Sequence, residues 1–277
     1  MPVDARRLIR KMRGGAQAHL IEAADGHTYV VKFANNPQHR RILVNEWIAA
    51  AFLHYLGIAT PEVAIVHVTA EFLERNPEVG FQLGQRTEAV ETGWHYGSRF
   101  PGDPATVAVY DFLPDTLLNQ VVNRGDFLGA LAFDQWMGNA DSRQTVFFRA
   151  RLRDWLPPFE AHPERLGFVA QMIDHGFVFD GPNWQLRDSP LQGLYHRPAV
   201  YERVRGLDDF QPWLDRIAHF PEAVVDRAIK QIPPGWLAGD EGALEQLLEQ
   251  AVRRGRRVAE LLEGCRRSRV NLFPNWR

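Results

Sequence analysis

The sequence predicts an α+β protein with two unequal lobes, and three observations support this fold class. The first hundred residues alternate β-rich runs with one helical pattern. A Gly/Pro-rich break, 101-PGDP-104, follows them. From residue 107 onward the apolar spacing is mainly helical. We therefore expect a small β-rich N-terminal lobe at residues 1–100 and a larger, mainly helical C-terminal lobe at residues 101–277.

The N-terminal lobe should contain a β-hairpin. Residues 17–23 and 28–33 are rich in residues that favour strands. The pair Asp25-Gly26 between them favours a tight turn with positive φ. Gly14-Gly15 lies just before the first run, where it should open the hairpin.

One helix is expected in the same lobe. Residues 39–56 have helical apolar spacing, Gly57 marks the end of the pattern, and Pro61 follows shortly after it. A strand should come next, at residues 62–69. Residues 93–100 have the composition of an extended segment that crosses toward the second lobe.

The C-terminal lobe should be built mainly from helices. Residues 115–137 predict one or two helices, and strands are expected near residues 145–149 and 168–173. Helices should fill most of residues 198–268. The tail at residues 270–277 is apolar, so we expect it to pack against the body of the protein.

Composition restricts the class of protein. Of the 277 residues, 45% are hydrophobic and 24% are charged, as in soluble globular domains. No apolar run approaches the ~18 residues of a membrane span. Cys265 is the only cysteine, which excludes an intramolecular disulfide and a zinc site made of thiolates. These features predict a cytoplasmic protein that does not contact a membrane.

The distribution of charge argues against a nucleic-acid binder. The net charge is -2 with histidine neutral, although 253-RRGRR-257 and 266-RRSR-269 are locally basic. Apolar residues recur at helical spacing through residues 241–268, so these arginines are expected on the solvated face of an amphipathic helix. Nucleic-acid binding is the less favoured alternative, and it predicts an affinity that falls steeply with salt.

A lysine and a glutamate are expected to form a pair. Arginine is the usual cation of this chain, and the lysines are Lys11, Lys32 and Lys230. The helical neighbours of Glu46 at three and four positions are apolar, so Glu46 should point into the core. A buried carboxylate requires a cationic partner, for which Lys32 on the preceding strand is the candidate. A functional pair, a structural salt bridge and a lysine that snorkels at a strand edge all fit this pattern.

Three polar stretches have the composition of binding or catalytic segments. In 13-RGGAQ-17 the glycines allow backbone N–H groups to approach an anion such as a phosphate. Within 134-DQWMGNADSRQTVFF-148, a polar stretch between the helix and the strand includes Asn139, Asp141, Arg143 and Gln144. Asp174 follows an apolar strand and precedes His175-Gly176, a placement suited to a carboxylate that binds a divalent metal.

The order of these features favours phosphoryl transfer. Taken singly, each stretch is also compatible with ordinary turn chemistry, and the chain has neither a Walker A motif nor a complete G-x-G-x-x-G. In sequence, however, the chain carries a glycine turn, a strand lysine, a helix glutamate, a polar loop with an aspartate, and a strand followed by Asp-x-Gly. These are the ordered parts of a two-lobed phosphotransferase.

At these residues the sequence resembles the HipA-like kinases, distant relatives of protein kinases and phosphatidylinositol kinases. The segment 14-GGAQAHL-20 resembles their glycine-rich loop, and 45-NEWIAAAFLHYLGIATPEV-63 resembles their helix and the turn after it. The segment 138-GNADSR-143 resembles their catalytic loop. The resemblance implies a bilobal, protein-kinase-like fold.

The resemblance also implies roles for the matching residues. The nucleotide-binding residues would be Gly14, Gly15, Ala16, Gln17, Lys32 and Glu46. Among them, Lys32 would contact the nucleotide phosphates and Glu46 would orient Lys32. Asp141 would align or deprotonate the acceptor hydroxyl, and Asp174 would hold Mg²⁺.

One position departs from the family pattern. The family has a metal-binding Asn five residues after the catalytic Asp, whereas this chain has Val146, which cannot ligate a cation. Gln144 is the candidate replacement, because its amide oxygen is a hard ligand of the same type. Asn139 and Asp134 are further candidates, and Asp134 is also placed to cap or orient the loop. His175 stands where many kinases have Phe.

The favoured interpretation is an ATP- and Mg²⁺-dependent phosphotransferase whose lobes clamp ATP. On the resemblance alone, the acceptor is a Ser or Thr hydroxyl of an unidentified protein. The main alternative is a catalytically impaired pseudokinase that binds nucleotide or a partner as a regulatory scaffold. Val146 favours that alternative, whereas the retention of Lys32, Glu46, Asp141 and Asp174 argues against it.

Overall fold

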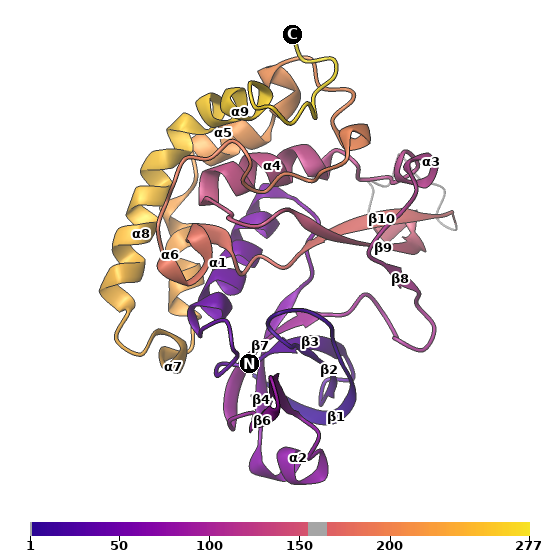
Figure 1. Cartoon of the computed structure of the whole chain (residues 1–277), viewed down its shortest axis with the longest axis vertical. Helices are drawn as coiled ribbons and strands as arrows, with labels where there is room; N and C mark the ends of the chain where they lie inside the picture. The colour runs from indigo at the N-terminus through magenta and orange to yellow at the C-terminus, as the bar shows by residue number, and fades with distance from the viewer. Residues whose placement is uncertain (1, 155–164) are drawn as a thin grey trace.

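A β-barrel, a helical body and a β-hairpin between them make up the computed structural model, which describes residues 2–154 and 165–277 (Figure 1). The barrel is closed and has the strand order β1-β2-β3-β7-β4. Neighbouring strands of the barrel pair antiparallel, except that β1 and β4 pair parallel. The strands are β1 (Val3–Lys11), β2 (His19–Ala23), β3 (Thr28–Lys32), β4 (Val63–Val68) and β7 (Gly93–Arg99).

The predicted hairpin is present as β2 and β3, with Gly26 at a φ of 80° in the turn between them. Strand β1 was not predicted, because most of its residues are exposed and polar and only Ala5 is buried. The expectation that residues 93–100 cross toward the second lobe was wrong, because β7 is a barrel strand between β3 and β4. Gly97 permits this packing, since a Cβ there would lie 2.6 Å from Val66.

Helix α1 (Arg41–Leu56) is the helix predicted for the first lobe, and it ends at Gly57 in the left-handed conformation. It lies between the barrel and the helical body (Figure 1), and most of its residues are buried. A helix buried on nearly all sides is apolar on nearly all sides, which explains why its few polar residues are informative. The barrel also carries α2 (Ala70–Arg75) and a hairpin of β5 (Gly80–Leu83) and β6 (Arg86–Ala89).

A small sheet in the order β10-β9-β8 follows, formed by β8 (Val109–Tyr110), β9 (Gln144–Arg151) and β10 (Leu166–Ile173). The helices predicted within residues 115–137 are α3 (Asp115–Leu118) and α4 (Asp126–Met137). One face of the β9–β10 hairpin packs on α4, where Phe147 stacks on Phe127 with ring centroids 6.4 Å apart.

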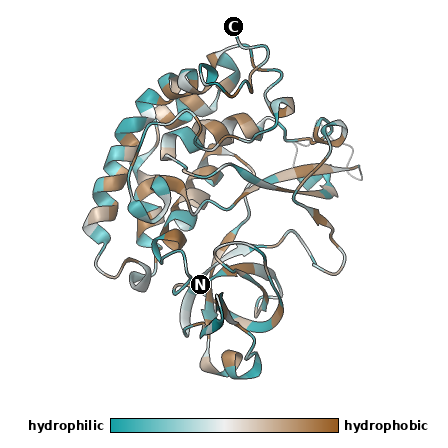
Figure 2. Cartoon of the chain, in the orientation of Figure 1, coloured by the Kyte–Doolittle hydropathy of each residue, from teal (hydrophilic) through white to brown (hydrophobic). Residues whose placement is uncertain are grey.

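The remaining helices complete a large apolar core (Figure 2). They are α5 (Trp213–Ala218), α6 (Glu222–Lys230), α7 (Pro234–Leu237), α8 (Glu241–Arg254) and α9 (Val258–Arg266). The C-terminal tail packs on the body as predicted, because Leu272, Phe273 and Trp276 are buried. Within the described residues, no helix has both the length and the hydropathy to cross a bilayer.

The prediction that the arginines of the C-terminal helices lie on a solvated face is wrong for Arg254. Arg253, Arg256 and Arg257 are exposed, as expected for a solvated helix face. Arg254 instead is buried: its guanidinium donates to the main-chain oxygen of Gln135 and forms an ion pair with Asp188. Arg254 is therefore a structural cation that holds α8 against α4.

Candidate active site

Lys32 forms the predicted ion pair with Glu46, and both side chains are buried. Lys32 is the last residue of β3, and Glu46 lies in the second turn of α1. The Lys32 Nζ also lies 2.5 Å from Oδ1 of Asp174, which follows β10. One ammonium therefore joins the barrel, α1 and the end of the β9–β10 hairpin.

The three charges influence one another strongly. Burial disfavours the charged form of Lys32, but Asp174 and Glu46 outweigh it and raise the pKa of the ammonium above its usual value. Lys32 in turn holds the pKa of Asp174 below its usual range. Burial raises the pKa of Glu46, against the opposing effect of Lys32. Both shifts favour the charged forms of Lys32 and Asp174.

The backbone around Asp174 is shaped to bring its carboxylate to Lys32. Asp174 has a φ of 58°, in the left-handed region. Gly176 packs directly against α1, because a Cβ there would lie 2.6 Å from Ile42 Cγ2 and 3.4 Å from Glu46 Oε1. The glycine of the Asp-x-Gly sequence is thus required for close approach to the helix that carries Glu46.

Asn45, to which the sequence analysis assigned no function, supports this segment. Its side-chain nitrogen lies 2.7 to 3.1 Å from the main-chain oxygens of Gly176, Val178 and Gly181. Its Oδ1 accepts a 2.8 Å hydrogen bond from Trp184. Asn45 is fully buried beside Glu46 in an apolar helix, and that unusual placement was the available signal.

Asp134 orients the predicted catalytic loop, one of the two roles expected for it. It is fully buried on α4, and its Oδ1 accepts a 2.9 Å hydrogen bond from the side chain of Asn139. The Asn139 Oδ1 in turn accepts from the backbone N–H of Asp141 at 3.1 Å. Asp134 on α4 therefore holds Asn139, and Asn139 in turn holds the backbone of the loop at Asp141.

Arg143 connects this loop to the segment around Asp174. Its guanidinium makes a bidentate ion pair with Asp134, in which Nε lies 2.8 Å from Oδ2. Its Nη1 donates to the main-chain oxygen of Ile173 at 3.0 Å and to Nδ1 of His175 at 2.8 Å. Arg143 thus contacts both neighbours of Asp174 in the sequence.

The protonation state of His175 follows from this geometry. A guanidinium can only donate, so Nδ1 of His175 accepts and the proton of the neutral ring resides on Nε2. That nitrogen lies 3.1 Å from the main-chain oxygen of Met172 and 3.0 Å from Oγ1 of Thr60. Burial lowers the pKa of His175 well below its usual value. His175 fills the buried site as a neutral, hydrogen-bonded ring.

Asp141 and Gln144 lie at the same end of the hairpin as Asp174. Gln144 pairs with Ile173, the residue before Asp174, in the β9–β10 register. Asp141 is half-buried, and its Oδ2 accepts a 3.2 Å hydrogen bond from the Gln144 side chain. The amide oxygen of Gln144 and the carboxylate of Asp174 are hard donors of the kind that Mg²⁺ takes together with substrate phosphates.

This donor set fits a metal that is shared with a substrate. In the two described ranges, no three His, Cys, Asp or Glu side chains form a metal-binding group. Val146, the apolar residue at the Asn position, pairs with Gln171 further along the hairpin and supplies no ligand. Mg²⁺ characteristically uses one or two protein carboxylates and completes its shell with phosphates and water.

The glycine loop connects β1 to β2. It is closed by a hydrogen bond from Met12 N to Ala18 O at 2.8 Å, and Gly14 has a φ of 122°. The side chain of Gln17 bonds the main chain of Gln82 in both directions, at 2.9 and 2.7 Å. Gln17 therefore anchors the loop to β5 through its side chain. Ala16 is buried.

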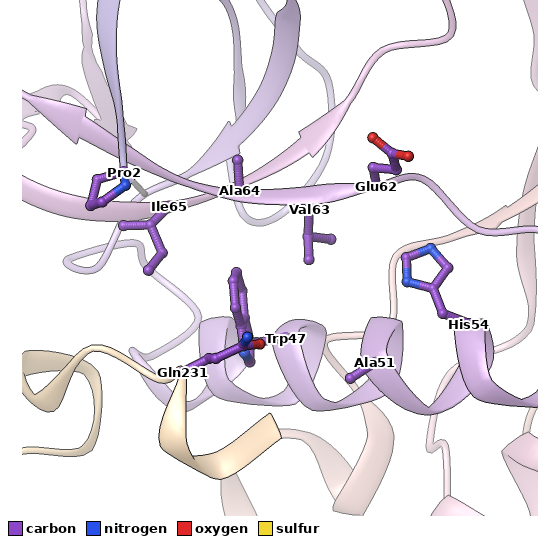
Figure 3. A pocket seen from close by; sticks show the side chains of 9 residues that line it. All are labelled: Pro2, Trp47, Ala51, His54, Glu62, Val63, Ala64, Ile65 and Gln231. Atoms are coloured by element: carbon purple, nitrogen blue, oxygen red, sulfur yellow. The ribbon is translucent and has the colours of Figure 1, made fainter. Parts of the chain in front are cut away.

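Two hollows in the surface lie away from these residues. One, of about 630 Å³, is bounded by α1 and β4 and is lined by Trp47, Ala51, His54 and Val63 among others (Figure 3). The other, of about 800 Å³, lies beside β1, β2 and the segment after β7. Neither is lined by any of the predicted site residues, so the candidate site is defined by its contacts around Lys32 and Asp174.

The chain is similar to known proteins in sequence and in fold. The family model described as HipA-like kinase matches residues 6–148. No curated protein matches the chain. Among solved structures, a Golgi casein kinase with Mn and ADP bound is similar with a TM-score of 0.50 and 13% identity, over 98% of this chain and 74% of that one. A hydra Fam20 structure with sugar is similar with the same TM-score and identity, over 98% of this chain and 86% of that one. These likenesses show a kinase-like fold.

Proposed function

Because the chain belongs to the family of HipA-like kinases, we propose that it transfers the γ-phosphoryl group of ATP to a hydroxyl acceptor, with Mg²⁺ as the metal. The observation that carries the proposal is the simultaneous contact of Lys32 with Glu46 and Asp174. A structural salt bridge needs only one carboxylate. The second carboxylate, Asp174, follows β10, and β10 pairs with β9, the strand that begins just after Asp141. Asp174 therefore lies at the same end of the hairpin as the residue proposed to align the acceptor hydroxyl.

Each residue then has a definite task. Lys32, oriented by Glu46, binds the nucleotide phosphates as a point charge. Asp174 and the amide oxygen of Gln144 hold Mg²⁺, which neutralises the charge that develops on the phosphoryl oxygens. Asp141 accepts a hydrogen bond from the acceptor hydroxyl and aligns it or removes its proton. The barrel side, residues 1–100, and the rest of the chain, residues 101–277, serve as the two lobes around ATP.

We further propose a Ser or Thr side chain of a protein as the acceptor and the cytoplasm as the place of action. The similar structure whose name specifies a casein kinase, and which holds Mn and ADP, supports a protein acceptor and a divalent metal. The location is supported by the single cysteine, which is buried and has no second cysteine with which to form an intramolecular disulfide.

The proposal is tested by separating binding from transfer. ATP is titrated calorimetrically into the wild type, Asp174→Asn and Asp141→Asn, with and without Mg²⁺, and phosphoryl transfer is followed with radiolabelled ATP. We expect Asp174→Asn to lose Mg²⁺-dependent binding, whereas Asp141→Asn binds like the wild type and transfers nothing. Wild-type turnover in Asp141→Asn would contradict its assignment. A wild-type protein that binds no nucleotide would contradict the function.

A second candidate function rests on Val146. An apolar side chain at this position favours a pseudokinase that binds nucleotide without transferring phosphate. Measuring phosphoryl transfer by the wild type and by Gln144→Leu distinguishes the two functions. A kinase that uses the Gln144 oxygen as a metal ligand loses transfer in this variant, whereas a scaffold shows no transfer in the wild type either.

A further inference from the structure

The face of the β9–β10 hairpin that points away from α4 carries a polar group with no partner among the residues that the structure describes. Opposite residues of an antiparallel pair share a face, and successive residues alternate. Phe147 and its partner Ala170 face the core on α4. The pairs Val146 with Gln171 and Gln144 with Ile173 therefore lie on the other face, which leads to Asp174.

Gln171 is the residue of interest on this face. Gln171 is only 8% exposed, and its Oε1 is buried with no hydrogen-bond partner among the described residues. A buried acceptor without a partner is destabilising, and native proteins rarely retain one unless a ligand or water completes it. The other described side-chain atoms of this kind lie elsewhere, on His19, Arg40, Gln135, Gln192 and Arg197.

The position of Gln171 suits one part of a nucleotide. It precedes Asp174 by three residues along β10, which corresponds to roughly 10 Å of extended strand. Phosphates held at Lys32 and Asp174 would leave the ribose and the base to extend from that end along the hairpin face. Val146, directly across from Gln171, offers an apolar surface on which a flat base can rest.

We propose that Gln171 binds the base of the nucleotide. Its amide oxygen accepts from an amino group of the base and its amide nitrogen donates to the adjacent ring nitrogen, the pattern by which glutamine pairs with adenine. This proposal rests on the proposed function and adds a base-reading residue to it. It also gives Val146 a role that requires no metal, as the apolar surface against which the base packs.

The test is Gln171→Met, which keeps the length of the side chain and removes the amide. Calorimetry compares ATP with inorganic tripolyphosphate, both with Mg²⁺, because tripolyphosphate has the phosphates but no base. We expect about tenfold weaker ATP binding and unchanged tripolyphosphate binding, as for the loss of one or two hydrogen bonds. The matched control is Gln192→Met, which removes another buried amide with an unpartnered oxygen and should leave ATP binding unchanged.

A second measurement excludes a purely structural effect. Because Gln171→Met removes an unsatisfied buried acceptor, the ligand-free variant should melt at or above the wild-type temperature. ATP affinity equal to that of the wild type would overturn the proposal and leave the proposed function intact. An equal loss of affinity for ATP and tripolyphosphate would also overturn it, whether or not the melting temperature falls. A wild type that binds neither ligand would overturn both proposals.

Discussion

The ammonium of Lys32 lies 2.5 Å from a carboxylate oxygen of Asp174, although the two residues are 142 positions apart in the chain. The contact joins the last residue of a barrel strand to the residue that follows β10. In the ligand-free protein, Lys32 therefore neutralises the carboxylate that we assign to the metal. Under the proposed function, Mg²⁺ that binds at Asp174 would compete with this ion pair, and the nucleotide phosphates would supply Lys32 with a replacement anion.

The first prediction concerns the stability of the Lys32–Glu46 pair. Lys32→Met leaves Glu46, which is 2% exposed, without its main counter-charge, and we expect a loss of about 3 to 5 kcal/mol in the free energy of unfolding. The double variant Lys32→Met/Glu46→Leu should recover most of this loss, because both buried charges are removed together. Chemical denaturation measures both. A single variant as stable as the wild type would show that the pair is not a buried unit.

A second prediction concerns the glycine of Asp-x-Gly. Gly176→Ala places a methyl group 2.6 Å from Ile42 and close to Glu46, so α1 must shift away from Asp174. We expect a destabilisation of about 1 to 3 kcal/mol together with weaker nucleotide binding. Gly242→Ala is the control, because open space surrounds that helical position and the change should stabilise α8 slightly. Equal behaviour of the two variants would argue against close packing at Gly176.

The third prediction concerns Arg143 as a positioning residue. Lysine keeps the charge but cannot contact Asp134, Ile173 and His175 together, as the guanidinium does. Arg143→Lys should lower kcat at least tenfold and change KM for ATP much less, because the spacing of Asp141 and Asp174 is disturbed.

Steady-state kinetics and a thermal melt test this expectation for Arg143. Arg253→Lys, a change at an exposed helix position, is the control and should leave both constants unchanged. A fall in kcat that is matched by an equal fall in the folded fraction would show that Arg143 only stabilises the fold and does not position the site.

The fourth prediction is a pH dependence of stability that originates inside the barrel. Nδ1 of His95 accepts from the backbone N–H of Ala34, and its Nε2 lies 3.0 Å from the main-chain oxygen of Glu91, so the ring is held neutral. Burial lowers the pKa of His95 to about 4. The unfolded chain binds a proton near pH 6.5 that the folded protein excludes, so stability is full above that pH and falls as the pH decreases toward 4.

The slope expected from this histidine is about 1.4 kcal/mol per pH unit within that window. His95→Gln should remove this part of the slope, as measured by urea denaturation at several pH values. His196→Gln, at an exposed position, should leave the slope as in the wild type. An unchanged slope in His95→Gln would show that folding does not lower the pKa of this ring.

The comparison of sequence and structure separates local from long-range information. The β2–β3 hairpin, the end of α1 at Gly57 and the burial of Glu46 follow from patterns within about twenty residues, and each was predicted. Strand β1 and the barrel position of β7 were missed, because a strand with a polar outer face or with two glycines in seven residues lacks the apolar alternation on which prediction depends.

By itself, the sequence determined which chemical groups are present, their order along the chain, and that Glu46 needs a cation. Only the tertiary structure decided that Lys32 serves two carboxylates, that Arg143 contacts both neighbours of Asp174, and that Asn45 holds the segment after it. These contacts join residues far apart in the chain. Their geometry depends on how the barrel, α1 and the hairpin pack against one another, which local propensity and spacing do not encode.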